Sequence, residues 1–225
     1  TQTIKRIRGL SSRSHKELRA ACDETTKAIE ANKGKEGKED TDADKYFRPF
    51  QLACGTSNAK MISAALDCTQ KLIAYGYLTG ETNVVDPTTG ESRKLMDIVV
   101  ETICACNSHT DENVQLQVIK ALLTAVSCNH CEIHETSLLL AVRACYHIHL
   151  VSRNSVNRTT AKGTLKQMLN ICFQKMEAYD IEHGAELEDL EKKVRHEEAA
   201  ARESPGVSGG NAPRKPEKPE AGKEE

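Results

Sequence analysis

One short segment near the middle of the chain has residue types that could bind a metal ion. Residues 128–134 read CNHCEIH, so Cys128, Cys131 and His134 form a C-x2-C-x2-H pattern. A zinc site needs four ligands at roughly 2.0–2.3 Å, and the fourth could be Cys104, Cys106 or His109 if the preceding helix ends nearby. A turn between two helices needs no metal, and no second C-x2-C occurs in the chain. These three residues are therefore weak candidates, and we expect neither a metal nor another cofactor.

The remaining reactive side chains do not form an enzyme motif. Most of the nine cysteines lie within apolar helical patterns, where a reduced cysteine acts as a small hydrophobic residue. The chain has no phosphate-binding glycine loop after a strand, and no serine, histidine and carboxylate set in a known motif. We therefore expect a binding domain without catalytic activity.

Aromatic residues are scarce in this chain and gather in two places. One group is Tyr46 and Phe47, followed by Phe50, and the other is Tyr75 and Tyr77. Lys71 lies four residues before Tyr75 and so shares its helix face. Aromatic residues beside a cation are typical of protein interfaces, which makes Lys71, Tyr75, Tyr77, Tyr46 and Phe47 candidate partner-binding residues. The alternative is that the rings close the core, with Phe47 and Phe50 its best candidates, and that Lys71 is an ordinary surface lysine.

Helices must position these residues. Apolar residues at helical spacing predict a helix from Ser57, as its cap, to Tyr75. Two central helices follow, one beginning after an Asp111 cap and one over residues 138–151. The second is apolar around most of its circumference, which predicts that it is buried on nearly all sides. Ser155 is expected to cap a further helix.

The fold class follows from these helices and their connections. The loop over residues 77–90 contains Pro87 and two glycines, and no strand is expected there or elsewhere. The sequence thus predicts an all-α protein, an armadillo- or HEAT-like stack of about six or seven helices without a sheet. Because no internal repeat is evident, a compact bundle is the alternative.

Composition predicts three segments. Residues 1–180 form the helical domain, residues 181–203 a charged helical extension, and residues 204–225, which are rich in proline and charge, a disordered linker toward a following domain. The net charge of −2 gives no overall attraction to nucleic acid. The sequence shows no signal peptide and no long apolar run, which predicts a cytoplasmic protein.

Several ordered segments resemble a known family. They are HKELRAACDETTKAIE, YFRPFQLAC, LDCTQKLIAYGYLTG, LMDIVVETICAC, DENVQLQVIKALLTAV, EIHETSLLLAVRACYHI and TTAKGTLKQMLN. Together they resemble the N-terminal DCB (dimerisation and cyclophilin-binding) domain of the large, brefeldin-A-inhibited guanine nucleotide exchange factors for Arf GTPases.

The resemblance implies a regulatory domain peripheral to the trans-Golgi membrane, which it would meet only indirectly. Its implied partners are an Arf-like GTPase in the GTP state, the following homology domain of the same protein, and a second copy of itself. The exchange domain lies further along such proteins, and nothing in this chain resembles it. Two alternatives are a helical-repeat adaptor for peptides, which would have a long groove, and a zinc-stabilised domain, which elemental analysis would reveal.

Overall fold

The computed structural model describes residues 1–32, 42–85, 90, 92–133 and 135–203. Most of these residues are helical, in the order α1 Gln2–Leu10, α2 Lys16–Asn32, α3 Arg48–Cys54, α4 Ala59–Ala74, α5 Leu95–Ala105, α6 Glu112–Ser127, α7 Glu135–Val151 and α8 Ser155–Glu203. A short 3-10 turn, Asp44–Tyr46, precedes α3. No described helix has an apolar stretch long enough to cross a membrane. The all-α class is confirmed, with one small addition.

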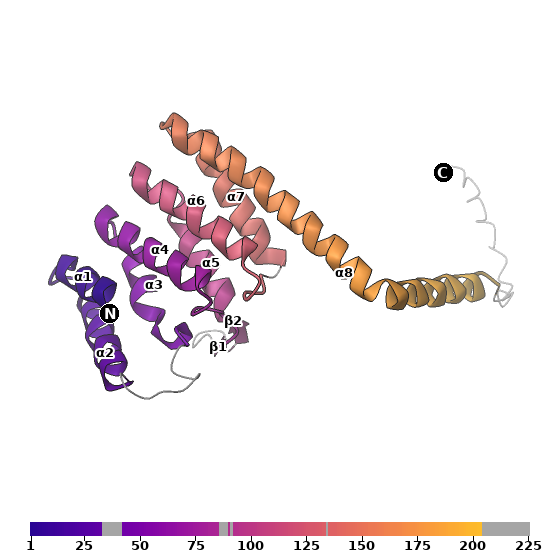
Figure 1. Ribbon diagram of the computed structural model, residues 1–225, viewed down its shortest axis with the longest axis horizontal. Coiled ribbons are helices and arrows are strands. Elements are labelled where there is room, and N and C mark those ends of the chain that lie inside the picture. Colours follow the sequence, from indigo (N-terminus) through magenta and orange to yellow (C-terminus); the bar gives the residue numbers. More distant parts are fainter. Residues whose placement is uncertain (33–41, 86–89, 91, 134, 204–225) are drawn as a thin grey trace, which may run out of the picture. The chain divides into compact units, whose positions relative to one another are not determined.

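Contacts divide the chain into the units Thr1–Lys175 and Met176–Glu225, with the boundary inside α8. The first unit contains the helical stack, which begins with α1 and α2 and continues through α3 and α4 to α5, α6 and α7 (Figure 1). The described part of the second unit is helix, and its side chains are mostly exposed. The proposed linker, residues 204–225, lies outside the described residues, and the predicted boundaries at 180 and 203 stay predictions.

The centre of the first unit is the contact between α4 and α6. Both helices place branched and small side chains at spacings of three and four toward each other, and α4 also packs on α1 and α3. The buried members include Met61, Ala65, Ile73, Val118 and Leu122. On the other side, α5 packs against α6 and α7. Each helix therefore buries one apolar stripe against its neighbours, as a layered helical stack requires.

A single buried carboxylate joins the start of α3 to the segment after α4. Asp44 Oδ1 accepts hydrogen bonds from the amides of Thr79 and Gly80, both at 3.0 Å. Its Oδ2 accepts from the Thr82 hydroxyl at 3.1 Å. Gly80 has φ +69°, and a Cβ there would lie 2.6 Å from the Met96 Cβ, so only glycine fits. The segment after α4 is thus held against both α3 and α5.

A two-stranded hairpin corrects the expectation that the protein contains no sheet. Strand β1, Asn83–Val85, pairs antiparallel with β2, Ser92–Lys94, within and just beyond the segment predicted as loop. Three residues are too few for an alternating pattern to stand out from a loop, which explains the error.

Helix α7 corrects a second expectation, because it is not buried on nearly all sides. Its inward face consists of small residues and one isoleucine, namely Ser137, Ala141, Ala144, Cys145 and Ile148. The opposite face is open, with Leu139, Tyr146 and Leu150 exposed to 51%, 54% and 61%. An apolar circumference in the sequence therefore did not mean a central position: α7 belongs to the last layer of the stack.

The helix caps are partly as predicted. Asp111 caps α6 as expected, because its carboxylate accepts from the amides of Asn113 and Val114 at 2.9 and 3.1 Å. Asn58, and not Ser57, caps α4 by accepting from Lys60 and Met61. Asn154 bonds the first amides of α8 in place of Ser155. In both corrected cases two capping residue types are adjacent, and local sequence does not choose between them.

Candidate partner-binding surface

The end of α4 presents two aromatic side chains to solvent. After Ala74 the chain passes through Gly76 in the left-handed conformation, φ +70°, and the Tyr77 and Leu78 amides donate back to the Leu72 carbonyl at 2.9 and 3.1 Å. This is the usual way in which a helix ends at a glycine. Tyr75 is 74% exposed and Tyr77 46%, with ring centroids 6.4 Å apart. The two rings therefore form a small aromatic surface, called here the tyrosine turn.

Lys71 lies one helical turn before this surface. Its ammonium group bonds the Asp67 carboxylate four residues earlier at 2.7 Å, and both side chains are exposed. The hydrogen bond with Asp67 raises the pKa of Lys71 above its usual value, so the amine is charged at any physiological pH. Among the candidates predicted from the sequence, the structure thus brings Lys71, Tyr75 and Tyr77 together.

The loop with the C-x2-C pattern packs against the backbone of the tyrosine turn. The Cys128 thiol donates to the Ile73 carbonyl at 3.7 Å, and the Cys131 thiol donates to the Leu78 carbonyl at 3.5 Å. The His130 ring lies against Gly76, where an added Cβ would be 3.3 Å from its Cδ2. Residues distant in sequence therefore fix the backbone on both sides of the two tyrosines, a role that the sequence did not suggest.

These thiol contacts also bear on the metal candidates. Burial raises the pKa of the Cys131 thiol to about 12, and the protonated thiol donates to a backbone carbonyl in this structure. Within the described residues, no three His, Cys, Asp or Glu side chains are grouped so that they could hold an ion. The third candidate, His134, lies outside the described residues.

The other aromatic pair divides between surface and core. The Ala43 amide donates to the Tyr77 carbonyl at 2.8 Å, so the segment before α3 runs beside the tyrosine turn. The Tyr46 hydroxyl accepts from Asn32 at 3.1 Å and its ring is half-buried. Phe47 is only 3% exposed and packs in the core together with Phe50. The core alternative therefore holds for Phe47, whose ring is not available to a partner in this conformation.

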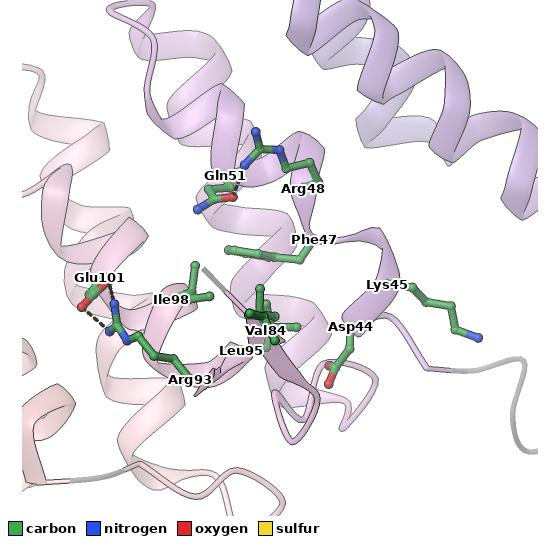
Figure 2. A pocket seen from close by; sticks show the side chains of 11 residues that line it. Asp44, Lys45, Phe47, Arg48, Gln51, Val84, Arg93, Leu95, Ile98 and Glu101 are labelled. Carbon is green, nitrogen blue, oxygen red and sulfur yellow. Dashed lines mark hydrogen bonds and ion pairs between the residues drawn. The ribbon is translucent and has the colours of Figure 1, made fainter. Parts of the chain in front are cut away.

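Phe47 borders a feature that the sequence did not reveal, a pocket of about 440 Å³ between α3, the hairpin and α5. Figure 2 shows the Phe47 ring between Ile98 and Val84, and Arg93 bonded to Glu101 at the rim. Its walls come from α3 and the 3-10 turn before it, from the hairpin and from α5. It is a local hollow and not the long groove that the peptide-adaptor alternative requires. Because the hairpin forms one wall of this pocket, a sequence analysis that predicted no strands could not predict the pocket.

Comparison with known proteins identifies the domain. The model of the family described as "Mon2/Sec7/BIG1-like, dimerisation and cyclophilin-binding domain" matches residues 1–180. The chain belongs to this DCB family. It is similar to brefeldin A-inhibited guanine nucleotide-exchange protein 1 of Homo sapiens, with 46% identity over 203 residues, which cover 81% of this chain and 11% of the human protein.

More distant relatives agree on the family. Brefeldin A-inhibited guanine nucleotide-exchange protein 2 of Arabidopsis thaliana is 46% identical over 61% of the DCB chain. The ADP-ribosylation factor guanine nucleotide-exchange factor sec71 of Schizosaccharomyces pombe is 38% identical over 58% of it. The chain spans 8% and 7% of these relatives' lengths. The matched region is thus the DCB region of exchange factors and not their exchange domain.

Proposed function

We propose that this DCB domain is a non-catalytic regulatory and targeting domain of an Arf guanine nucleotide exchange factor, which acts peripherally at the trans-Golgi. It binds an Arf-like GTPase in the GTP state. The observation that carries this proposal is the tyrosine turn, where two exposed rings lie beside a charged lysine. Tyrosine is among the residues that contribute most to protein interfaces, and a cation at the rim adds orientation.

The geometry also fits a partner that changes with its nucleotide. The two tyrosines lie on a turn whose backbone is fixed by Gly76 and by hydrogen bonds from the thiols of Cys128 and Cys131. A preformed surface of this kind loses little conformational entropy when it binds. The GTPase has to supply an ordered counterpart, and its switch loops are ordered only in the GTP state. Binding should therefore require GTP.

The experiment measures GTPase affinity and thermal stability together for Lys71→Ala and Tyr77→Ala. Removal of an interface side chain of this type should weaken binding by about ten-fold or more, while the melting temperature stays within a degree or two because both residues are exposed. Lys120→Ala on α6 is the matched control, since Lys120 is also exposed but lies on another element. Unchanged affinity in both test variants would mean that the GTPase binds elsewhere.

A second surface supports the proposed contact with the following homology domain. Helix α7 exposes Leu139, Tyr146 and Leu150, whose spacing of seven and four residues places them on one helix face. The last layer of a helical stack with an apolar outer face is unfinished, because a terminal layer normally presents polar residues to water. We propose that the following domain covers this face in the whole protein, and that a second copy covers it when the domain is alone.

A further inference from the structure

The opposite end of the stack carries positive charge of unusual density. Residues 1–19 contain six Lys or Arg side chains and a single carboxylate, Glu17, whereas the whole chain has a net charge of −2. Helices α1 and α2 pack on each other, so these residues lie together in the first layer of the stack (Figure 1). We call the cations Arg6, Arg13, Lys16 and Arg19 the basic end.

The fold itself does not use these four charges. Arg8 and Lys5 do have structural roles, since Arg8 bonds Asp23 and Lys5 bonds Glu30. In the described part of the chain, by contrast, none of the four cations of the basic end forms an ion pair. Two carboxylates near these cations bond other residues, since Glu17 bonds Arg48 at 2.6 Å and Asp23 bonds Arg8. The basic end therefore carries charge that no ion pair among the described residues neutralises, and Arg6 lies in a hollow that also contains carboxylates, those of Asp67 and Asp111.

One of these cations stands where the helix itself disfavours it. Lys16 is the first residue of α2, and Arg13 lies three residues before it. The N-terminal turn of a helix carries partial positive charge, which favours Asp and Glu and opposes Lys and Arg. A terminal layer needs polar residues for solubility, but either sign of charge would serve. Neither helix stability nor solubility therefore explains why the charge of the basic end is positive. Residues that oppose local stability in this way are expected at functional sites.

The side chains exposed on the first helices indicate which class of partner the basic end can bind. Every large apolar side chain that the described chain exposes lies at Tyr75 or beyond, so α1 to α3 expose none. A protein partner would be expected to find an aromatic or aliphatic anchor, and a single-stranded nucleic acid would need stacking rings. An anionic lipid surface needs neither, because its attraction for Lys and Arg depends on charge and proximity alone.

We propose that the basic end binds an anionic membrane surface directly, in addition to any recruitment by a GTPase. The expectation that the membrane lies close rests on the proposed function, and the contact itself rests on the charges described above. The headgroup could be a phosphatidylserine or a phosphoinositide, whose shared chemistry is negative charge. Direct contact goes beyond the indirect association expected from the sequence.

The test is sedimentation of the full 225-residue chain with vesicles of phosphatidylcholine alone, with added phosphatidylserine, or with a phosphoinositide at equal charge. We expect binding to both anionic vesicles and none to the neutral ones, with loss at high salt because ions screen exposed charges. Stronger binding to the phosphoinositide would identify that headgroup as the source. Equal binding to neutral and anionic vesicles, or to none, would overturn the proposal.

Variants localise the contact. The triple variant Arg13→Ala, Lys16→Ala, Arg19→Ala should bind anionic vesicles roughly a hundred-fold more weakly, at about five-fold for each cation. Its matched control, Lys120→Ala, Lys162→Ala, Lys166→Ala, removes the same charge from exposed positions on α6 and α8 and should retain most of the binding. Equal losses in the two variants would overturn the assignment to the basic end.

Two further readouts keep the outcomes separate. GTPase affinity of the triple variant, measured in solution without lipid, should be unchanged, so failure here and failure of the proposed GTPase surface are distinguishable. Binding of the basic end to polyglutamate or to duplex DNA, without vesicle binding, would assign it to an acidic protein or a nucleic acid and would refute the lipid proposal. Melting temperatures of both triple variants show whether they fold.

Discussion

The two ends of the helical stack use apolar residues in opposite ways. At the first end, α1 buries Ile4 and Ile7 and the exposed surface is charged. At the last end, α7 buries mainly alanine, cysteine and serine and exposes Leu139, Tyr146 and Leu150. The first layer thus has the polar outer face that is usual for a terminal layer, whereas the last layer exposes apolar side chains. The difference shows that an apolar outer face is confined to the last layer of the stack, whereas the first layer has a polar one.

The largest expected effect compares one apolar side chain from each end. Ile7→Ala should lower the free energy of unfolding by about 3 kcal/mol, because the side chain is fully buried and leaves a cavity. Leu150→Ala should change it by less than about 0.5 kcal/mol, since 61% of Leu150 is exposed. Urea unfolding measures both. Similar losses of unfolding free energy in the two variants would show that the outer face of α7 is buried in solution. That result would contradict the difference between the two ends.

A second prediction concerns the carboxylate that joins the first layers to the centre. Asp44→Asn should lower the free energy of unfolding by about 2 kcal/mol, because one amide group cannot accept all the bonds from Thr79, Gly80 and Thr82. Asp111→Asn is the matched control: it also accepts two amides, but at a helix N-cap, where asparagine serves as well as aspartate. Equal effects of the two changes would mean that the Asp44 contacts contribute little.

The third prediction tests the unfinished end directly. Leu139→Gln together with Leu150→Gln should reduce self-association of the isolated domain, measured by sedimentation velocity, and change the melting temperature little. Val85→Gln is the control, because Val85 is exposed to a similar degree on the hairpin, away from α7. If the double variant and the control sediment like the unmodified domain, the α7 face is not where two copies meet.

The smallest expected effect is the pH dependence of an ion pair in the first layer. The hydrogen bond from Arg8 lowers the pKa of Asp23 below its ordinary value of 3.8. A carboxylate whose folded pKa is depressed contributes stability above its unfolded pKa and loses it as pH falls through the folded pKa. The melting temperature of Asp23→Asn should therefore lie slightly below that of the unmodified domain near neutral pH, and the gap should close in acid. A gap that stays constant with pH would contradict this.

What could be predicted from the sequence is mostly local. The cap at Asp111, the helix that carries Lys71 and Tyr75, and the all-α class follow from spacing within about one helix. The burial of α7 was mispredicted because its apolar circumference does not show on which sides it has neighbours. The pair Tyr46 and Phe47 is a similar case: adjacent aromatic residues separate into surface and core only through the turn that precedes α3.

The candidate surface was predictable in part for the same reason. Lys71 and Tyr75 share a helix face, and Gly76 marks the helix end, so the sequence brings these residues together. The support from Cys128 and Cys131 could not be predicted, because it joins segments that are 55 and 53 residues apart. The same sulfur atoms suggested a metal site when considered alone. Their spacing fits a zinc ligand pair, and in the structure both thiols donate to backbone carbonyls.

The bonds to Asp44 have a consequence for the motions of the domain. The amides of Thr79 and Gly80 donate to a buried carboxylate from a segment 35 and 36 residues away, outside any helix. Helical amides can exchange with solvent by fraying of one helix end, but these two are released only when the segment after α4 separates from the start of α3. Their deuterium uptake therefore reports on opening between layers, whereas uptake at α1 also includes fraying. In a hydrogen-exchange experiment with a bound partner, slower exchange at Thr79 and Gly80 would mean that binding at the neighbouring tyrosine turn tightens the stack itself.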